Sequence, residues 1–216
     1  MILQALAPNE LPRRMKRAAV LCVVLSGLFG VFSGGESIAV ARADDAQERE
    51  PSRLDQLGPL SPQQTREINE KISVAQHTAL EGMRSFRVFV LAGLFLSCAL
   101  CFVASGRLVR PLGASRESMR KLLVGSAVAV AAFRTLDAAQ GAVIWGKVGA
   151  AYAKVTAALP ETDPAVAGHL QPFIVGAYLV WSAGVVGAFL LLSQYFRQPH
   201  VRTFLVTAAG PDGHAD

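Results

Sequence analysis

A chain of 216 residues has room for one compact domain or for a small bundle of membrane helices. Hydrophobic residues make up 52% of it, charged residues make up 17%, and the mean hydropathy is +0.37, so the chain lacks the charged surface of a typical water-soluble domain. This composition excludes an intrinsically disordered chain, and three cysteines are too few for a disulfide-stabilised scaffold. We therefore expect an all-α fold, a multi-pass transmembrane helical bundle.

Residues 1–43 predict a signal peptide or a signal anchor. A basic cluster at 13–17 precedes an uncharged apolar stretch at 18–32. Residues 41–43, Ala-Arg-Ala, match the small-x-small pattern of a signal cleavage site, which places the cut after Ala43. Because the apolar stretch is short for a membrane span, cleavage is the favoured interpretation and a retained anchor is the alternative.

Residues 44–60 are polar and interrupted by proline and glycine, and they predict an exported linker. An exported amphipathic helix is expected at 61–87, because Ser61 and Pro62 form a good helix start. No stop signal is evident before the next apolar run, so this helix is expected to run directly into the membrane.

One narrow face of the 61–87 helix is apolar, since its residues recur at spacings of three and four. A long helix with such a stripe is marginal alone and needs a packing partner. We interpret the stripe as a candidate docking surface for the outward extension of the second span, at 148–159, or for another protein. Its members are Ile68, Ile72, Ala75, Ala79 and Met83.

Three apolar runs, at 88–105, 122–146 and 173–196, are long enough to cross a bilayer. The sequence therefore predicts a transmembrane bundle over 88–196 with three spans, or four if the N-terminal segment is retained. The remaining residues, 197–216, are expected to form a cytoplasmic tail.

Basic residues exceed acidic residues in the loop at 106–121, which predicts that this loop and the C-terminus are cytoplasmic. Residues 44–87 and 147–171 then face outward. The net charge of +5 is therefore interpreted as an orientation signal and not as a nucleic-acid-binding surface. The expected partner is the lipid bilayer, and association with another membrane protein or with a second copy of the chain is the further possibility. The excess of arginine over lysine is typical of a GC-rich bacterium, so the bacterial inner membrane is the expected location.

Arg134 and Asp137 lie within the second apolar run, and Gln140 lies one step further along the same helix face. An isolated charge at that depth costs roughly 2.5–3.5 kcal/mol on insertion scales, so the two charges are expected to compensate each other. Two interpretations remain open. The pair either fixes helix packing, or it takes part in proton, ion or substrate handling.

Cys98 and Cys101 are expected to be inert packing residues, because apolar surroundings disfavour the reactive thiolate. No histidine lies within a predicted span, and no catalytic or phosphate-binding motif occurs, so no enzymatic activity, cofactor or metal is predicted. The leading hypothesis is a non-enzymatic membrane subunit or assembly and interaction factor that docks through its exported helix. The alternative is an ion- or proton-linked transport or sensing component that uses the Arg134–Asp137 pair.

Overall fold

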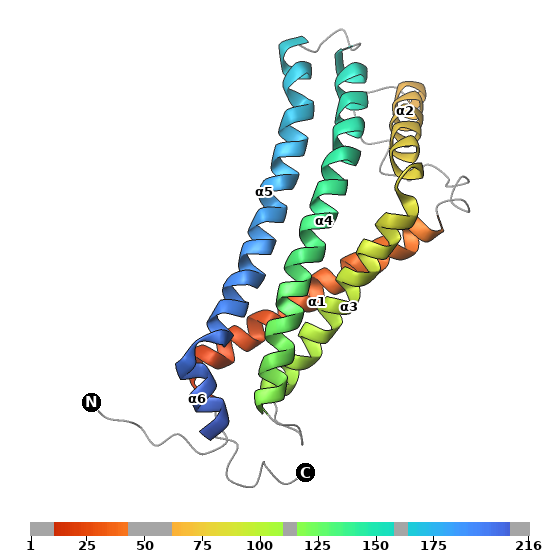
Figure 1. Ribbon diagram of the computed structural model, residues 1–216. Coiled ribbons are helices and arrows are strands. Elements are labelled where there is room, and N and C mark those ends of the chain that lie inside the picture. The colour runs from red at the N-terminus through yellow and green to blue at the C-terminus, as the bar shows by residue number, and fades with distance from the viewer. Residues whose placement is uncertain (1–10, 43–61, 110–115, 158–163, 208–216) are drawn as a thin grey trace. The chain divides into compact units, whose positions relative to one another are not determined.

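The computed structural model describes residues 11–42, 62–109, 116–157 and 164–207. Within these ranges the chain forms six helices and no strand, as expected for an all-α fold (Figure 1). In chain order the helices are α1 (Arg13–Ala41), α2 (Pro62–Glu81), α3 (Arg84–Val109), α4 (Arg116–Ala157), α5 (Pro164–Arg197) and α6 (Pro199–Thr207).

Four helices are long and apolar enough to cross a membrane, which indicates a membrane-embedded protein. The apolar windows lie within Arg13–Ala41, Arg84–Val109, Arg116–Lys154 and Gly168–Arg197. The three predicted spans each lie inside one of these helices. The N-terminal segment meets the same length and composition criteria as the other three.

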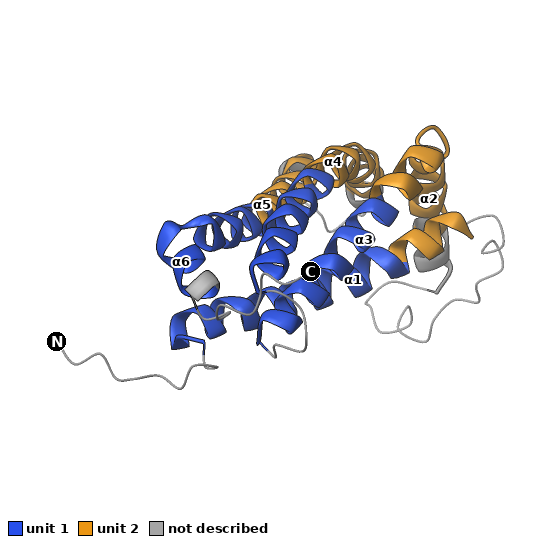
Figure 2. Ribbon diagram, turned by 60° about the horizontal axis from the view of Figure 1, so that its bottom comes forward, with its two compact units in different colours: residues 1–35, 91–134, 184–216 blue, residues 36–90, 135–183 orange. Residues whose placement is uncertain are grey.

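The chain divides into two compact units, shown in blue and orange in Figure 2. Unit 1 comprises residues 1–35, 91–134 and 184–216, and unit 2 comprises residues 36–90 and 135–183. Helices α1, α3, α4 and α5 each contribute residues to both units.

Unit 1 has an apolar core to which α1 contributes directly. Cys22 of α1 is fully buried together with Cys98 and Cys101 of α3 and Phe189 of α5. The rings of Phe29 and Phe189 meet edge to face at 6.4 Å. The first part of α1 therefore packs as an integral element of this unit.

The predicted continuous helix across 61–87 is wrong at one point, because α2 ends at Glu81 and α3 begins at Arg84. Gly82 and Met83 form a turn between them, in which the Met83 N–H donates to the Leu80 carbonyl over 3.1 Å. Glycine is the weakest helix former after proline, and an exposed glycine between two helical segments permits this break.

Helices α4 and α5 extend well beyond the apolar runs that predicted them. The 42 residues of α4 span about 63 Å at 1.5 Å per residue, twice the roughly 30 Å hydrocarbon core of a bilayer. Helix α5 begins at Pro164 and contains Pro172, so most of the predicted outward loop at 147–171 is helical. A hydropathy run marks only the apolar part of a helix, and the helix itself continues into more polar sequence.

Candidate functional site

The most unusual feature of unit 2 is a buried guanidinium. Arg87 lies in the first turn of α3 and is only 5% exposed. Its Nη2 donates to Glu36 Oε1 near the end of α1, and its Nη1 lies 3.4 Å from Asp137 Oδ1 on α4. One arginine thus connects carboxylates on two other helices. We call Glu36, Arg87 and Asp137 the charge cluster.

Asp137 is 1% exposed and also lies next to Tyr178 of α5. The Tyr178 hydroxyl lies 3.4 Å from Asp137 Oδ2 and 3.5 Å from the Asp137 carbonyl oxygen, and donates toward them. Gly141 makes this approach possible, because a Cβ at that position would lie 2.5 Å from the Tyr178 ring. Trp145 packs beside Tyr178 with the ring centroids 6.4 Å apart.

The charge cluster is a high-energy arrangement that depends on all its members. Removing a charged group from water costs on the order of several kcal/mol, and oppositely charged groups close by must offset this desolvation cost. Arginine suits the role because its planar guanidinium can engage several acceptors at once. Asp137 is almost completely buried, whereas the Glu36 side chain is 47% exposed, so the Arg87–Asp137 contact is the better shielded of the two.

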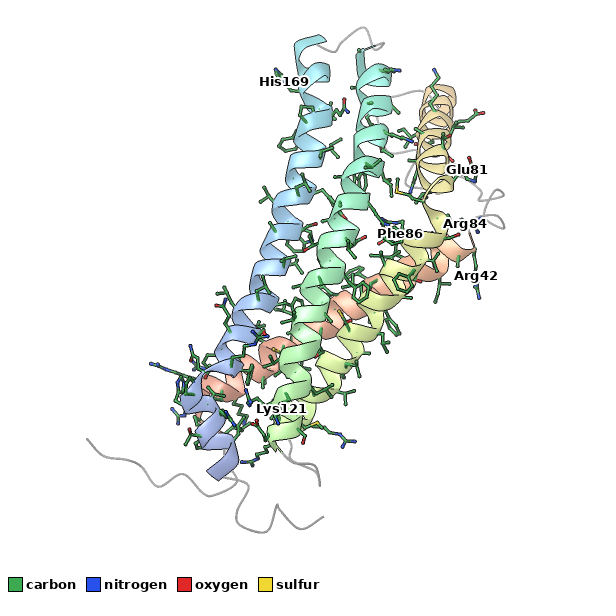
Figure 3. All side chains as sticks on the ribbon, in the orientation of Figure 1. Arg42, Glu81, Arg84, Phe86, Lys121 and His169 are labelled. Carbon is green, nitrogen blue, oxygen red and sulfur yellow. The ribbon has the colours of Figure 1, made fainter. Side chains whose placement is uncertain are left out.

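Arg84, one turn before Arg87, holds the end of α1 in a second way. Its Nε donates to the Val40 carbonyl over 3.1 Å, and its Nη2 donates to the Ala41 carbonyl over 2.7 Å. The last carbonyls of a helix have no partner within that helix, so a cationic donor there is favourable. Figure 3 shows Arg84 and Glu81 near the turn between α2 and α3. The predicted cleavage residue Ala43 lies outside the described residues.

The structure places the predicted polar residues as follows. Asp137 belongs to the charge cluster, and Arg134 is half-buried three residues earlier on α4. Gln140 is 7% exposed, and within the described residues its Nε2 and Oε1 have no hydrogen-bond partner. The Arg134–Asp137 pair stays a prediction, since the cation found beside Asp137 Oδ1 is Arg87.

Sequence reasoning missed Glu36, Arg87 and Tyr178. Glu36 was assigned to the polar end of a signal peptide, and Arg87 to the last position of the exported helix. Both border apolar runs, where charges are ordinary. Tyr178 carries no charge and lies inside an apolar run. The sequence did contain a signal. Glu36 follows the first apolar segment and Arg87 precedes the next, so these two opposite charges are expected on the same side of the membrane.

Part of the predicted docking stripe is covered by this chain's own α4. Ala79 is buried in a cluster with Ile144 and Val148. Ile72 and Met83 pack against that cluster, and Leu80 joins them. Ala75 is half-buried, and the side chain of Ile68 lies outside the described part of the structure. Val148 begins the outward extension that was one of the two expected partners of the stripe.

A cavity of about 620 Å³ adjoins the charge cluster within unit 2. Residues from the end of α1, from α2, from the first turn of α3 and from α4 line it. Glu36 and Arg87 lie on its wall, so part of the charge cluster is accessible from this cavity.

These features define a class of protein, an all-α membrane-embedded helical protein with a buried charge cluster that links three helices. In the part of the chain that is described, no group of three or more histidine, cysteine or acidic side chains could hold a metal ion. No family model, no curated protein and no solved structure matches this chain.

The charge cluster predicts strong energetic coupling between Arg87 and Asp137. Arg87→Met and Asp137→Leu should each destabilise the protein by roughly 3–5 kcal/mol, because each removes a charged partner from a buried charge. The double variant should be clearly more stable than the sum of the single effects predicts. Denaturant unfolding of the full chain in detergent micelles measures all three.

The same double-mutant cycle with Arg134→Met is the matched control, because it tests the other arginine on α4. A larger coupling energy for Arg134 with Asp137 than for Arg87 with Asp137 would restore the pair predicted from the sequence. Strictly additive effects of Arg87→Met and Asp137→Leu would contradict the cluster as an energetic unit.

Proposed function

We propose that this protein is a non-enzymatic integral membrane protein of the bacterial inner membrane, acting as an ion- or proton-responsive component in sensing or transport. The observation that carries this proposal is the burial of Arg87 between carboxylates from two other helices. Ionisable residues within membrane proteins are costly and commonly mark sites of function.

The spacing of charges along the helices supports a position of the charge cluster near one membrane boundary. On each of these three helices, a basic residue lies about 16–20 positions from the cluster member, which corresponds to roughly 24–30 Å along the helix axis. The pairs are Arg17 with Glu36 on α1, Arg107 with Arg87 on α3, and Lys121 with Asp137 on α4. This distance matches the roughly 30 Å hydrocarbon core. With the basic ends cytoplasmic, the cluster lies near the outer boundary.

The charge cluster has a simple way to respond to protons. Protonation of Asp137 removes one negative partner of Arg87 and weakens the connection between α3 and α4. A cation that competes for either carboxylate of the charge cluster would act in the same direction. The response then appears as a shift between two helix arrangements of unit 2.

The charge cluster also supports retention of α1 as a fourth span. Cleavage after Ala43 would remove Glu36 from Arg87 and would remove Met15, Ala19 and Cys22 from the core of unit 1. The favoured reading from sequence, a cleaved signal peptide, conflicts with both roles. A retained anchor, the alternative, is compatible with them.

An interaction or assembly factor that docks through α2 is the second candidate. The observation that favours it is the exposure of α2 outside its covered stripe, including Val74, which is 60% exposed. With Ala79 packed on α4, a partner would have to use this open face instead of the stripe.

Proton response is tested by spin-label distances within unit 2. Labels on Glu70→Cys and Lys154→Cys, in a chain whose native cysteines are replaced by alanine, report the separation of α2 and α4. We expect this distance to change when the pH is lowered from neutral into the acidic range. In Asp137→Asn the distance should keep its acidic value at both neutral and acidic pH. Glu117→Gln is the control, since Glu117 pairs with Arg120 on α4 and should leave the response intact. A distance independent of pH would refute proton response.

Retention of α1 is tested by the intact mass of the protein extracted from membranes. We expect the mass to include residues 1–43, because α1 supplies Glu36 and part of the unit 1 core. A mass that begins at Asp44 would show cleavage and would remove Glu36 from the functional protein.

Docking is tested by cysteine cross-linking. Ala79→Cys with Val148→Cys should form an intrachain disulfide on mild oxidation, because both positions belong to one buried cluster. The measurement is the loss of two reactive thiols that a reductant restores. Val74→Cys should cross-link to one defined membrane protein if docking through the open face is the function. Capture from position 79 with none from position 74 would return the docking surface to the stripe.

A further inference from the structure

The cavity beside the charge cluster has the size and lining of a small-molecule site. Its volume of about 620 Å³ falls within the roughly 300–1,000 Å³ of typical ligand pockets. The side chains on its wall that carry chemistry are Glu36, His77, Glu81, Arg87 and Trp145. All of them belong to unit 2, and they come from four helices.

The charges on this wall favour a cation. Glu36 and Glu81 contribute two carboxylates, and His77 Nδ1 lies 3.2 Å from Glu81 Oε1. Arg87, the arginine on the wall, is shared between Glu36 and the buried Asp137, so Glu36, Glu81 and Asp137 together outweigh its single positive charge. Negative charge in a concave, partly apolar surface concentrates cations.

An aromatic wall narrows the kind of cation. Trp145 is 42% exposed and lines the cavity, and indole is the best cation–π partner among the side chains. Apolar neighbours such as Ile144 and Leu80 complete this side. Such a surface suits an alkylated ammonium ion, whose charge is spread over methyl or methylene groups, better than a hydrated inorganic ion.

We propose that this cavity binds a small organic ammonium ion. The ammonium group lies between Trp145 and the carboxylates of Glu36 and Glu81. The same ammonium group occurs in a free organic amine and in the ethanolamine headgroup of a lipid. The inference rests on the cavity and not on proton response, so either one can fail alone.

Trp145 fluorescence tests this proposal directly. The chain has two tryptophans, and Trp181→Phe leaves Trp145 as the single reporter. Titration with choline should give a saturable change in emission. Its neutral isostere 3,3-dimethyl-1-butanol, which has the same shape without the charge, should bind at least tenfold more weakly. Equal affinities for choline and the neutral isostere, or no saturation with choline, would overturn the proposal.

A pair of matched variants locates the site. Glu81→Gln should weaken choline binding at least tenfold, because it removes one wall carboxylate whose side chain is 66% exposed and carries little of the fold. Glu70→Gln removes an exposed acid on the same helix that does not line the cavity, and binding should be unchanged. An equal loss in both variants would show nonspecific charge attraction and contradict the site.

Two further measurements complete the test. Equilibrium dialysis of radiolabelled choline with the unmodified chain gives the same comparison if Trp181→Phe fails to fold. Nanodiscs of phosphatidylglycerol alone, or with phosphatidylethanolamine, separate the two sources of the ligand. Competition by phosphatidylethanolamine would support the site with a lipid headgroup as ligand. Unchanged choline affinity would support the site with a free ammonium ion as ligand.

Discussion

The arrangement of unit 2 depends on one physical constraint, the need of a buried guanidinium for negative partners. Arg87 is removed from water, and the carboxylates that compensate it come from other helices. Arg84, one turn earlier, donates to the final carbonyls of α1. Two arginines at the start of α3 thus hold the end of α1 by its side-chain charge and by its backbone. Apolar packing could not replace either contact, because hydrogen bonds and ion pairs fix the orientation of the two helices and apolar contacts are non-directional.

The break between α2 and α3 allows both helices to pack against the same face of α4. Asp137, Ile144 and Val148 are seven and then four residues apart, so they lie on one face of α4. The first contacts Arg87 of α3, and the other two bury Ala79 of α2. A single face of α4 therefore receives both helices, one through charge and one through apolar contact. The turn at Gly82 and Met83 separates the two contacts into independently directed helices.

The existence of the long helices could be predicted from the sequence, but their ends could not. Each apolar run at 88–105, 122–146 and 173–196 lies inside a helix, because an apolar segment in lipid must satisfy its own backbone hydrogen bonds. Hydropathy describes the environment of a helix and not its length, so the apolar runs did not give the ends of α4 and α5, although an outward extension of the second span at 148–159 was expected. Pro172 directly precedes the predicted span at 173–196, yet it lies inside α5.

The candidate site could likewise be predicted only in part from the sequence. Asp137 was found because a charge within an apolar run is conspicuous. Its partner could not be found, since sequence spacing nominates only neighbours on the same helix, and Arg134 is the nearest basic residue. Arg87 lies 50 positions away, and no periodic pattern connects it with Asp137. Contacts between helices depend on packing directions, which a single sequence does not contain.

The two units satisfy their buried polar groups differently, and this difference is the reason why the proposed proton response is placed in unit 2. In unit 1 the hydroxyls of Ser26, Ser97 and Ser105 donate to carbonyls one turn earlier in their own helices. These bonds are neutral, and protonation leaves them unchanged. Arg120 there has its acid partner, Glu117, three residues away on the same helix, and its Nη1 donates to the neutral Phe196 carbonyl of α5. In unit 2 the carboxylates partner an arginine on a different helix, so a change in their charge changes how helices are held together.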